Sequence, residues 1–202
     1  ADMRQAVGEL GDAPAPARVR ALSRLARALM VAGRVDEARA VAGVALEIAA
    51  PSAVRERMHL LTTLGSCSTG WDDLPAGRAA LEQGLAIAQS AGDAYGIVRA
   101  HHNLASTGPD RPPADALALA ARGIEVAGAR GIRMLEVWVR HLRASVLVGA
   151  GDLDGAAREL DATARLLGSS APAGHAYEAI QHGIIGALLA EARGDAEAAA
   201  AR

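Results

Sequence analysis

The sequence predicts an all-α fold, and three features of its 202 residues lead to that prediction. Apolar residues make up 51% of the chain, but alanine dominates them, with no Phe and only two Trp and two Tyr. Alanine has the highest helix propensity, and its small side chain suits close contact between helices. The alternation of Val, Ile, Thr and aromatic residues that is typical of strands is nearly absent. The last of the three features is that short turns recur at regular intervals along the chain.

These turns divide the chain into similar units. In each unit an apolar helix leads to a glycine, acidic residues follow, and a second, alanine-rich helix begins. The turn glycines are spaced 37 to 43 residues apart and are Gly33, Gly70, Gly108, Gly151 and Gly194. Acidic residues suit the start of a helix because its N-terminus carries partial positive charge and unpaired N–H groups. A period in this range, with two helices per unit, indicates an α-solenoid.

We expect a lead-in at residues 1–14 and one repeat domain over 15–202. The units are expected at 15–51, 52–92, 93–131, 132–170 and 173–202, with the last one truncated. In the first unit Gly33 ends one helix, Asp36 and Glu37 begin the next, and Pro51 ends it. Small residues then allow the two helices of each unit to cross closely, and these are Ala38, Gly77, Ala116, Ala156 and Ala199.

The third unit is irregular. Residues 106–115 read STGPDRPPAD and hold three prolines where the first helix should finish. Proline removes a backbone donor and interrupts a helix interior, so this helix should end near Thr107, before an exposed loop at 108–113. Two interpretations stay open: a tolerated loop variation, or a hinge or docking loop.

The repeated residues resemble the tetratricopeptide repeat. Its first helix carries a pair that occurs here as Leu25–Ala26, Leu64–Gly65 and Leu104–Ala105, and its second helix is clearest here as Ala38, Ala42, Ala45 and Pro51. The sequence departs from the pattern at four positions, which are Gly84, Gly123, Arg140 and Arg143. The resemblance covers about residues 15–202, and it implies a right-handed α-solenoid of about five helix-turn-helix repeats.

A narrower resemblance concerns the longer period and the segments at 91–106 and 116–131. They are similar to the C-terminal repeat arrays of bacterial LuxR-type and related ATPase transcriptional regulators, which are common in actinomycetes. This resemblance implies a cytoplasmic sensory or docking arm of a regulator. The chain holds no G-x-x-x-x-G-K-[ST] phosphate loop and no convincing helix-turn-helix for DNA, so neither activity is expected of it.

Composition narrows the classes of partner. The net charge is −2, so no overall field attracts nucleic acid or a membrane surface. Every basic residue is Arg. The single cysteine, Cys67, rules out an intramolecular disulfide and suggests a reducing compartment. No apolar run reaches the roughly 18 residues that a membrane span needs, and no signal peptide is visible. We expect a segment of a longer cytoplasmic protein.

The sequence predicts no enzyme, no metal site and no cofactor. His101 and His102 are adjacent, so on a helix they point about 100° apart and cannot chelate one metal ion. A helical zinc pair needs an i, i+4 spacing, which this segment lacks. Cys67 lies between two serines without a base nearby, so a small buried thiol is the simpler interpretation. No catalytic residue is therefore expected.

The resemblance instead implies a binding groove lined by the first helix of each unit. Positions spaced i, i+3, i+7 and i+10 share one helical face. The candidate groove residues are Arg20, Arg27, His59, Arg99, His102, Trp138 and His141. Arginines grip carboxylates or phosphates bidentately, and a Trp anchors apolar or cationic groups. The groove would hold a peptide or protein segment, including one from another domain of the parent chain, or a small acidic ligand. The competing interpretation is a solvated face with Trp138 packed between repeats.

Three functions follow from these expectations. The first is a non-catalytic interaction module of a transcriptional regulator, without direct nucleic-acid or membrane contact. The second is a small-molecule sensor in which the proline-rich loop and Trp138 cover a pocket. The third is a scaffold that self-associates, for example as a homodimer, through the ends of the solenoid.

Overall fold

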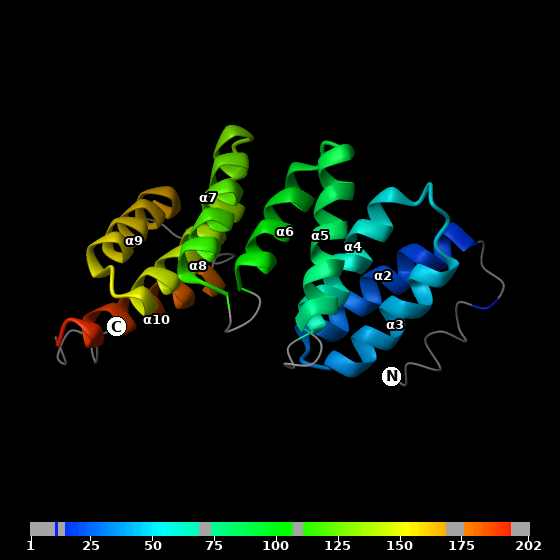
Figure 1. The fold of residues 1–202 in the computed structure, drawn as a ribbon, viewed down its shortest axis with the longest axis horizontal. Helices are drawn as coiled ribbons and strands as arrows, with labels where there is room; N and C mark the ends of the chain where they lie inside the picture. Colours follow the sequence, from blue (N-terminus) through cyan, green and yellow to red (C-terminus); the bar gives the residue numbers. More distant parts are fainter. Residues whose placement is uncertain (1–10, 12–14, 69–73, 107–110, 169–175, 195–202) are drawn as a thin grey trace. The chain divides into compact units, whose positions relative to one another are not determined.

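The computed structural model describes residue 11 and residues 15–68, 74–106, 111–168 and 176–194. This part of the chain holds nine helices and no strand, so the predicted all-α class is confirmed (Figure 1). The helices are α2 (Ala15–Val31), α3 (Val35–Ile48), α4 (Val54–Cys67), α5 (Leu74–Ser90), α6 (Ala94–Ser106), α7 (Pro113–Ala129), α8 (Arg133–Ala150), α9 (Leu153–Leu167) and α10 (Ala176–Ala192).

The chain forms two compact units, Ala1–Gly108 and Pro109–Arg202. In the first unit, each helix packs against the next one along the chain, from α2 to α6. In addition, α4 contacts both α2 and α6, so these three helices lie side by side (Figure 1). The core beneath α2 and α3 is built from small and branched residues, including Leu22, Ala26, Val41 and Leu60. This arrangement follows from the alanine-rich sequence, because small side chains bring helix axes close together.

The second unit packs α7 against α8 and α8 against α9, and α10 contacts both α8 and α9. Its core includes Ala144, Leu147, Leu160, Ile185 and Leu189. Contact between alternate helices, here α8 and α10, thus occurs in both units. Such contacts between neighbouring helix pairs are what a helical repeat array requires, because one pair cannot bury its apolar face alone.

The helix ends explain the recurring glycines. Gly151 has φ of 81°, and two backbone hydrogen bonds close the end of α8: Gly151 N–H to Val148 O and Asp152 N–H to Leu147 O, both 3.0 Å. A non-glycine residue adopts this left-handed conformation at a cost. The Asp152 side chain then accepts a hydrogen bond from Gly155 N at 2.8 Å and begins α9. The sequence thus stops one helix and starts the next within two residues.

Other glycines share this geometry. The predicted turn glycines Gly33 and Gly194 also have positive φ, whereas Gly70 and Gly108 lie outside the described residues. Gly92 and Gly131, which connect one helix pair to the next, also have positive φ, as does Gly168 at the end of α9. The repeat pattern predicts a glycine only within each helix pair, so it does not indicate these three.

Close helix crossing is clearest between α4 and α5. A Cβ atom added at Gly65 would lie 2.7 Å from the backbone oxygen of Gly77, and one added at Gly77 would overlap Ser68. The backbones of the two helices are therefore nearly in contact, and only glycine fits at both positions. The repeat pattern predicts a small residue for this crossing at Gly77, and Gly65 belongs to the Leu–Gly pair of the first helix.

Arg140 and Arg143, which depart from the tetratricopeptide pattern, form an ion network between α8 and α9. Arg140 donates to Glu159 at 2.9 Å and to Glu136 at 2.8 Å, and Arg143 donates to the second Glu159 oxygen at 2.8 Å. Glu159 is buried, and both of its oxygens have a guanidinium partner. The tetratricopeptide pattern has apolar residues at these two positions. The arginines fit there because the carboxylates of Glu136 and Glu159 match their charges.

Some expectations fall outside the described residues: most of the lead-in at 1–14, and the second helix of the last unit after Gly194. The proline-rich segment is described in part. Helix α6 ends at Ser106, one residue before the expected end, and α7 begins at Pro113, while residues 107–110 lie outside the described part. Within the described residues, no helix combines the length and apolar character that crossing a bilayer requires.

We predict that two neighbouring glycines respond oppositely to replacement by alanine. Gly151→Ala should lower the free energy of unfolding by about 1 kcal/mol, because its φ is positive. Gly149→Ala should raise it by about 0.5–1 kcal/mol, because Gly149 lies in α8 with no atom near the added Cβ. Urea denaturation of both variants measures the difference. Equal effects would show that Gly151 does not hold the turn.

Candidate functional site

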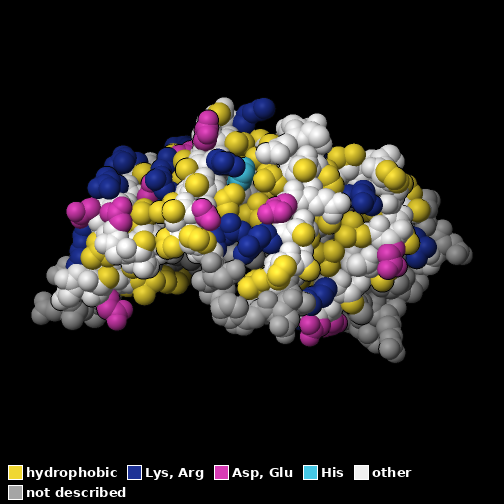
Figure 2. Space-filling model, viewed as in Figure 1, with side chains coloured by type: hydrophobic (Ala, Val, Ile, Leu, Met, Phe, Trp, Pro, Cys, Tyr) yellow, Lys and Arg dark blue, Asp and Glu magenta, His cyan; other side chains and the backbone are white. Residues whose placement is uncertain are grey.

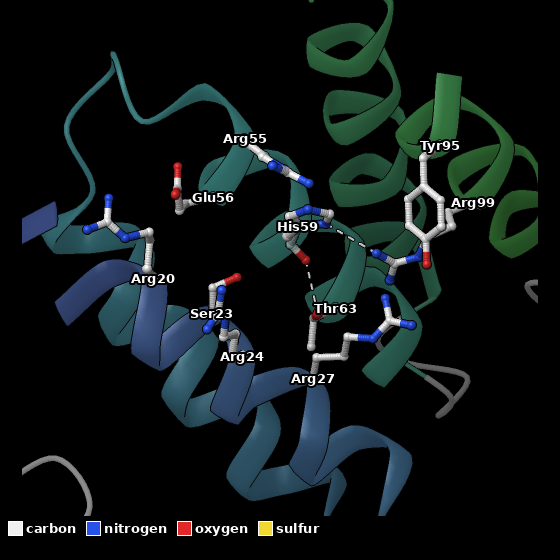
Figure 3. Close-up of a pocket in the computed structure, with 10 residues that line it drawn as sticks. All are labelled: Arg20, Ser23, Arg24, Arg27, Arg55, Glu56, His59, Thr63, Tyr95 and Arg99. Atoms are coloured by element: carbon white, nitrogen blue, oxygen red, sulfur yellow. Dashed lines mark hydrogen bonds between the residues drawn. The ribbon is translucent and has the colours of Figure 1, made fainter. Parts of the chain in front are cut away.

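A pocket of about 420 Å³ lies over α2, α4 and α6 in the first unit. We call it the arginine pocket, and Figure 3 shows its lining. The residues are Arg20, Ser23, Arg24 and Arg27 of α2, Arg55, Glu56, His59 and Thr63 of α4, and Tyr95 and Arg99 of α6. On each helix they are spaced three or four residues apart, which places them on one helical face. Because α4 packs against both other helices, the three faces meet.

The charge of this pocket is unbalanced. Five arginines line it against one glutamate. Within the part of the chain that the structure describes, none of the five forms an ion pair with a carboxylate. The chain as a whole has a net charge of −2, and on the face drawn in Figure 2 arginine and acidic side chains are interspersed. The positive charge of the pocket is therefore a local feature.

Arg99 is the most buried of these arginines, with 5% of its surface exposed. Its guanidinium Nη1 lies 3.2 Å from His59 Nδ1, and its Cζ atom lies 5.7 Å from the centre of the Tyr95 ring. Neither partner is an anion. Burial, followed by repulsion from Arg27, lowers the pKa of Arg99 to about 10, so it stays charged at neutral pH.

His59 is held as a neutral ring. A guanidinium only donates hydrogen bonds, so His59 Nδ1 must accept from Arg99 and the ring proton lies on Nε2. Burial, followed by the charge of Arg99, lowers the pKa of His59 below its ordinary value. Thr63 Oγ1 donates to the His59 backbone oxygen at 2.9 Å, which is a local bond within α4 (Figure 3). The pocket thus presents cations and a neutral imidazole, a combination that suits an anion.

The structure brings together four of the seven candidate groove residues: Arg20, Arg27, His59 and Arg99. His102 lies on α6 but does not line the pocket; its Nδ1 is 3.2 Å from Asn103 Oδ1, and burial lowers its pKa to about 4. Trp138 is half-buried on α8 in the second unit.

His141, also on α8, is only 4% exposed. Its Nε2 lies 3.4 Å from Nδ1 of His182 on α10, and the two rings are tilted at 59°. Thr163 Oγ1 donates to Leu160 O, so it accepts from His182 Nδ1 at 3.0 Å. His182 therefore donates its single Nδ1–H to Thr163, and His141 Nε2, at the longer distance of 3.4 Å, can only share that same N–H. Burial, followed by the charge of His182, lowers the pKa of His141 to about 4. The ring faces a helix contact in the second unit.

The i, i+3 spacing from Arg20 also predicts Ser23, but sequence reasoning missed the other five lining residues, which are Arg24, Arg55, Glu56, Thr63 and Tyr95. Each lies three or four residues from a predicted one: Arg24 follows Arg20 by four, and Tyr95 precedes Arg99 by four. The search used a narrow stripe with one residue per turn, whereas a helical face is wider. A wider face on each first helix would have found all five.

Among the described residues, no group of three or more His, Cys, Asp and Glu side chains is placed to hold a metal ion. No protein-family model matches the sequence, and no curated protein matches it significantly. The interpretation of the arginine pocket therefore depends on its own geometry and charge.

We predict that Arg99→Met stabilises the protein. The substitution removes a buried guanidinium that has no anionic partner among the described residues, and replacing buried charge with an apolar side chain is often favourable. The free energy of unfolding at pH 7 should rise by about 1 kcal/mol, whereas exposed Arg24→Met should change it by less than about 0.5 kcal/mol. Lower stability of Arg99→Met would show that the contacts with His59 and Tyr95 outweigh the cost of burial.

We also predict that His141 makes the fold sensitive to acid. Its folded pKa of about 4 lies below the unfolded value of 6.5, so between these values the unfolded chain binds more protons. The free energy of unfolding should therefore decrease as the pH is lowered from 6.5 to 4. This residue contributes up to about 1.4 kcal/mol per pH unit to the decrease. Denaturation of His141→Gln at several pH values should show a shallower slope than wild type between pH 6.5 and 4, and the same slope above pH 7. Identical slopes throughout would contradict the prediction.

Proposed function

We propose that this chain is a non-catalytic binding module whose arginine pocket holds an acidic segment of a partner protein. The observation that carries the proposal is the set of five guanidiniums without a carboxylate partner among the described residues. Solvated arginines are common on protein surfaces, but here one of them is buried and all five converge from three helices. A site that gathers like charges gains free energy when an anion enters it.

The geometry favours an extended acidic ligand. Arg20, Arg24 and Arg27 follow one another along α2, while Arg55 and Arg99 approach from α4 and α6 (Figure 3). Each guanidinium can bind a carboxylate bidentately, which gives directional as well as electrostatic recognition. Several acidic side chains of one segment could thus be bound at once, so their contributions would combine.

The type of module is part of the proposal. The resemblance to tetratricopeptide repeats, together with the consecutive packing of helix pairs, supports a repeat array that serves as a docking arm of a bacterial transcriptional regulator. The second candidate is a sensor for a small acidic metabolite. A volume of about 420 Å³ favours it, because pockets of this size commonly enclose small molecules.

The proposal predicts selective binding of acidic peptides. A fluorescein-labelled peptide of alternating Glu and Ser should bind, whereas the same peptide with Gln for Glu should bind at least tenfold more weakly. Fluorescence anisotropy measures both. Affinity for the acidic peptide should fall as salt rises from 50 to 300 mM, because screening weakens exposed charge pairs.

A double variant, Arg20→Gln/Arg55→Gln, tests the site. The control is the single variant Arg122→Gln. The double variant removes two exposed charges of the pocket and should weaken binding about tenfold or more. Arg122 is exposed on α7, outside the pocket, so its variant should bind like wild type. Equal binding of the acidic and Gln peptides, or equal losses in both variants, would overturn the proposal.

A further inference from the structure

We infer that the end of the arginine pocket formed by Arg27, His59 and Arg99 is a subsite for a phosphate monoester. This inference rests on the proposed function, because it specifies the group that the acidic ligand places at one end of the same pocket.

The two ends of the pocket differ. Glu56, the one carboxylate among the described lining residues, lies near Arg20 and Arg55 (Figure 3). Arg27 and Arg99 lie at the other end, where their guanidiniums extend into the same region beside Tyr95 (Figure 3). The first end therefore carries partly compensated charge, and the second end carries two positive charges with no acidic residue among the described lining residues.

The charge at this second end exceeds what one carboxylate can neutralise. Repulsion from Arg27 contributes to the lowered pKa of Arg99, which shows that the two guanidiniums interact. The carboxylate of Asp93 acts on Arg99 through its charge, but it forms no ion pair with Arg99 within the described residues and accepts a hydrogen bond from Gly96 N at 3.1 Å. A carboxylate brings one negative charge, whereas a phosphate monoester brings about 1.5 to 2 at pH 7.

The donors also suit a phosphate. Each guanidinium carries five N–H groups, and among the described residues Arg99 forms one side-chain hydrogen bond, the bond to His59 Nδ1. Arg27 is exposed and forms no hydrogen bond or ion pair within the described part of the chain. Two bidentate forks can approach the three terminal oxygens of a phosphate from different sides, whereas a carboxylate offers only two oxygens.

Two sources could supply this group. One is a phosphorylated side chain within the acidic segment, and the other is a free, small phosphate ester. Their chemistry at the subsite is the same, so the structure assigns the group and the experiment separates the sources. The remaining arginines at the Arg20 end would contact acidic flanks only when the phosphate belongs to a peptide.

The test uses three peptides that differ at one central position, which is phosphoserine, Glu or Ser, between identical acidic flanks. Isothermal titration calorimetry measures their affinities for wild type and for three variants: Arg27→Gln, Arg99→Gln and, as control, Arg24→Gln. We expect the phosphoserine peptide to bind wild type at least tenfold more tightly than the Glu peptide. This preference should fall below twofold in the Arg27 and Arg99 variants and persist in the Arg24 variant.

Circular dichroism confirms that each variant is folded, and Arg27 is exposed, so its variant keeps the test decisive if Arg99→Gln unfolds. Competition with N-acetyl-phosphoserine identifies the source. Displacement at a concentration close to the peptide's Kd supports a small phosphate ester, and displacement only at a hundredfold excess supports a phosphorylated segment.

Three results would overturn the inference. If the phosphoserine and Glu peptides bind equally, the subsite does not select phosphate, while the proposed function stands. If the phosphate preference persists in both Arg27→Gln and Arg99→Gln, the phosphate binds elsewhere. If none of the three peptides binds wild type, the inference and the proposed function both fail.

Discussion

The packing of α4 against both α2 and α6 is the constraint on which the first unit depends. It requires close helix contacts, and the sequence provides them with glycine and alanine. At the α4–α5 crossing the backbones approach so closely that a side chain at Gly65 or Gly77 would overlap its neighbour. Because these contacts fix the rotation of α4, the face that carries Arg55 and His59 is directed between the faces that carry Arg27 and Arg99. The arginine pocket is thus a consequence of how the helices pack.

The arrangement of charge in the two units shows why the pocket differs from an ordinary ion network. In the second unit Arg140 and Arg143 share the buried Glu159, so each oxygen of that carboxylate has a guanidinium partner. In the first unit the buried Arg99 contacts a neutral imidazole and an aromatic ring instead of a carboxylate. A buried charge without a counterion is unfavourable for folding, and such local costs are typical of sites adapted to bind rather than to stabilise. The contrast within one chain makes a purely structural role for Arg99 the weaker explanation.

The fold class, several turn glycines and four residues of the arginine pocket could be predicted from the sequence, whereas the contacts between helices could not. The all-α class followed from alanine content, and Gly33, Gly151 and Gly194 were found because left-handed turns favour glycine. Arg20, Arg27, His59 and Arg99 were found because helical periodicity places them on one face. The pairing of Arg99 with His59 was not predictable, since it depends on the rotation and distance of two helices. The burial of His141 was missed for the same reason.

Helical periodicity selects equivalent first-helix positions in the two units, but the side chains at these positions are exposed to a pocket in one unit and buried in the other. Arg27 and His59 are first-helix residues that line a pocket, whereas His141, a first-helix residue by the same rule, is buried against His182 on α10. Periodicity determines which residues share a face, but the neighbouring helix determines whether that face is open or covered. In the first unit Arg27 and Arg99, which come from two different helices, repel each other and therefore do not pack together. In the second unit His182 donates to Thr163 and the ring of His141 packs beside it, so the contact is closed. The open site is therefore where the sequence places like charges on facing helices.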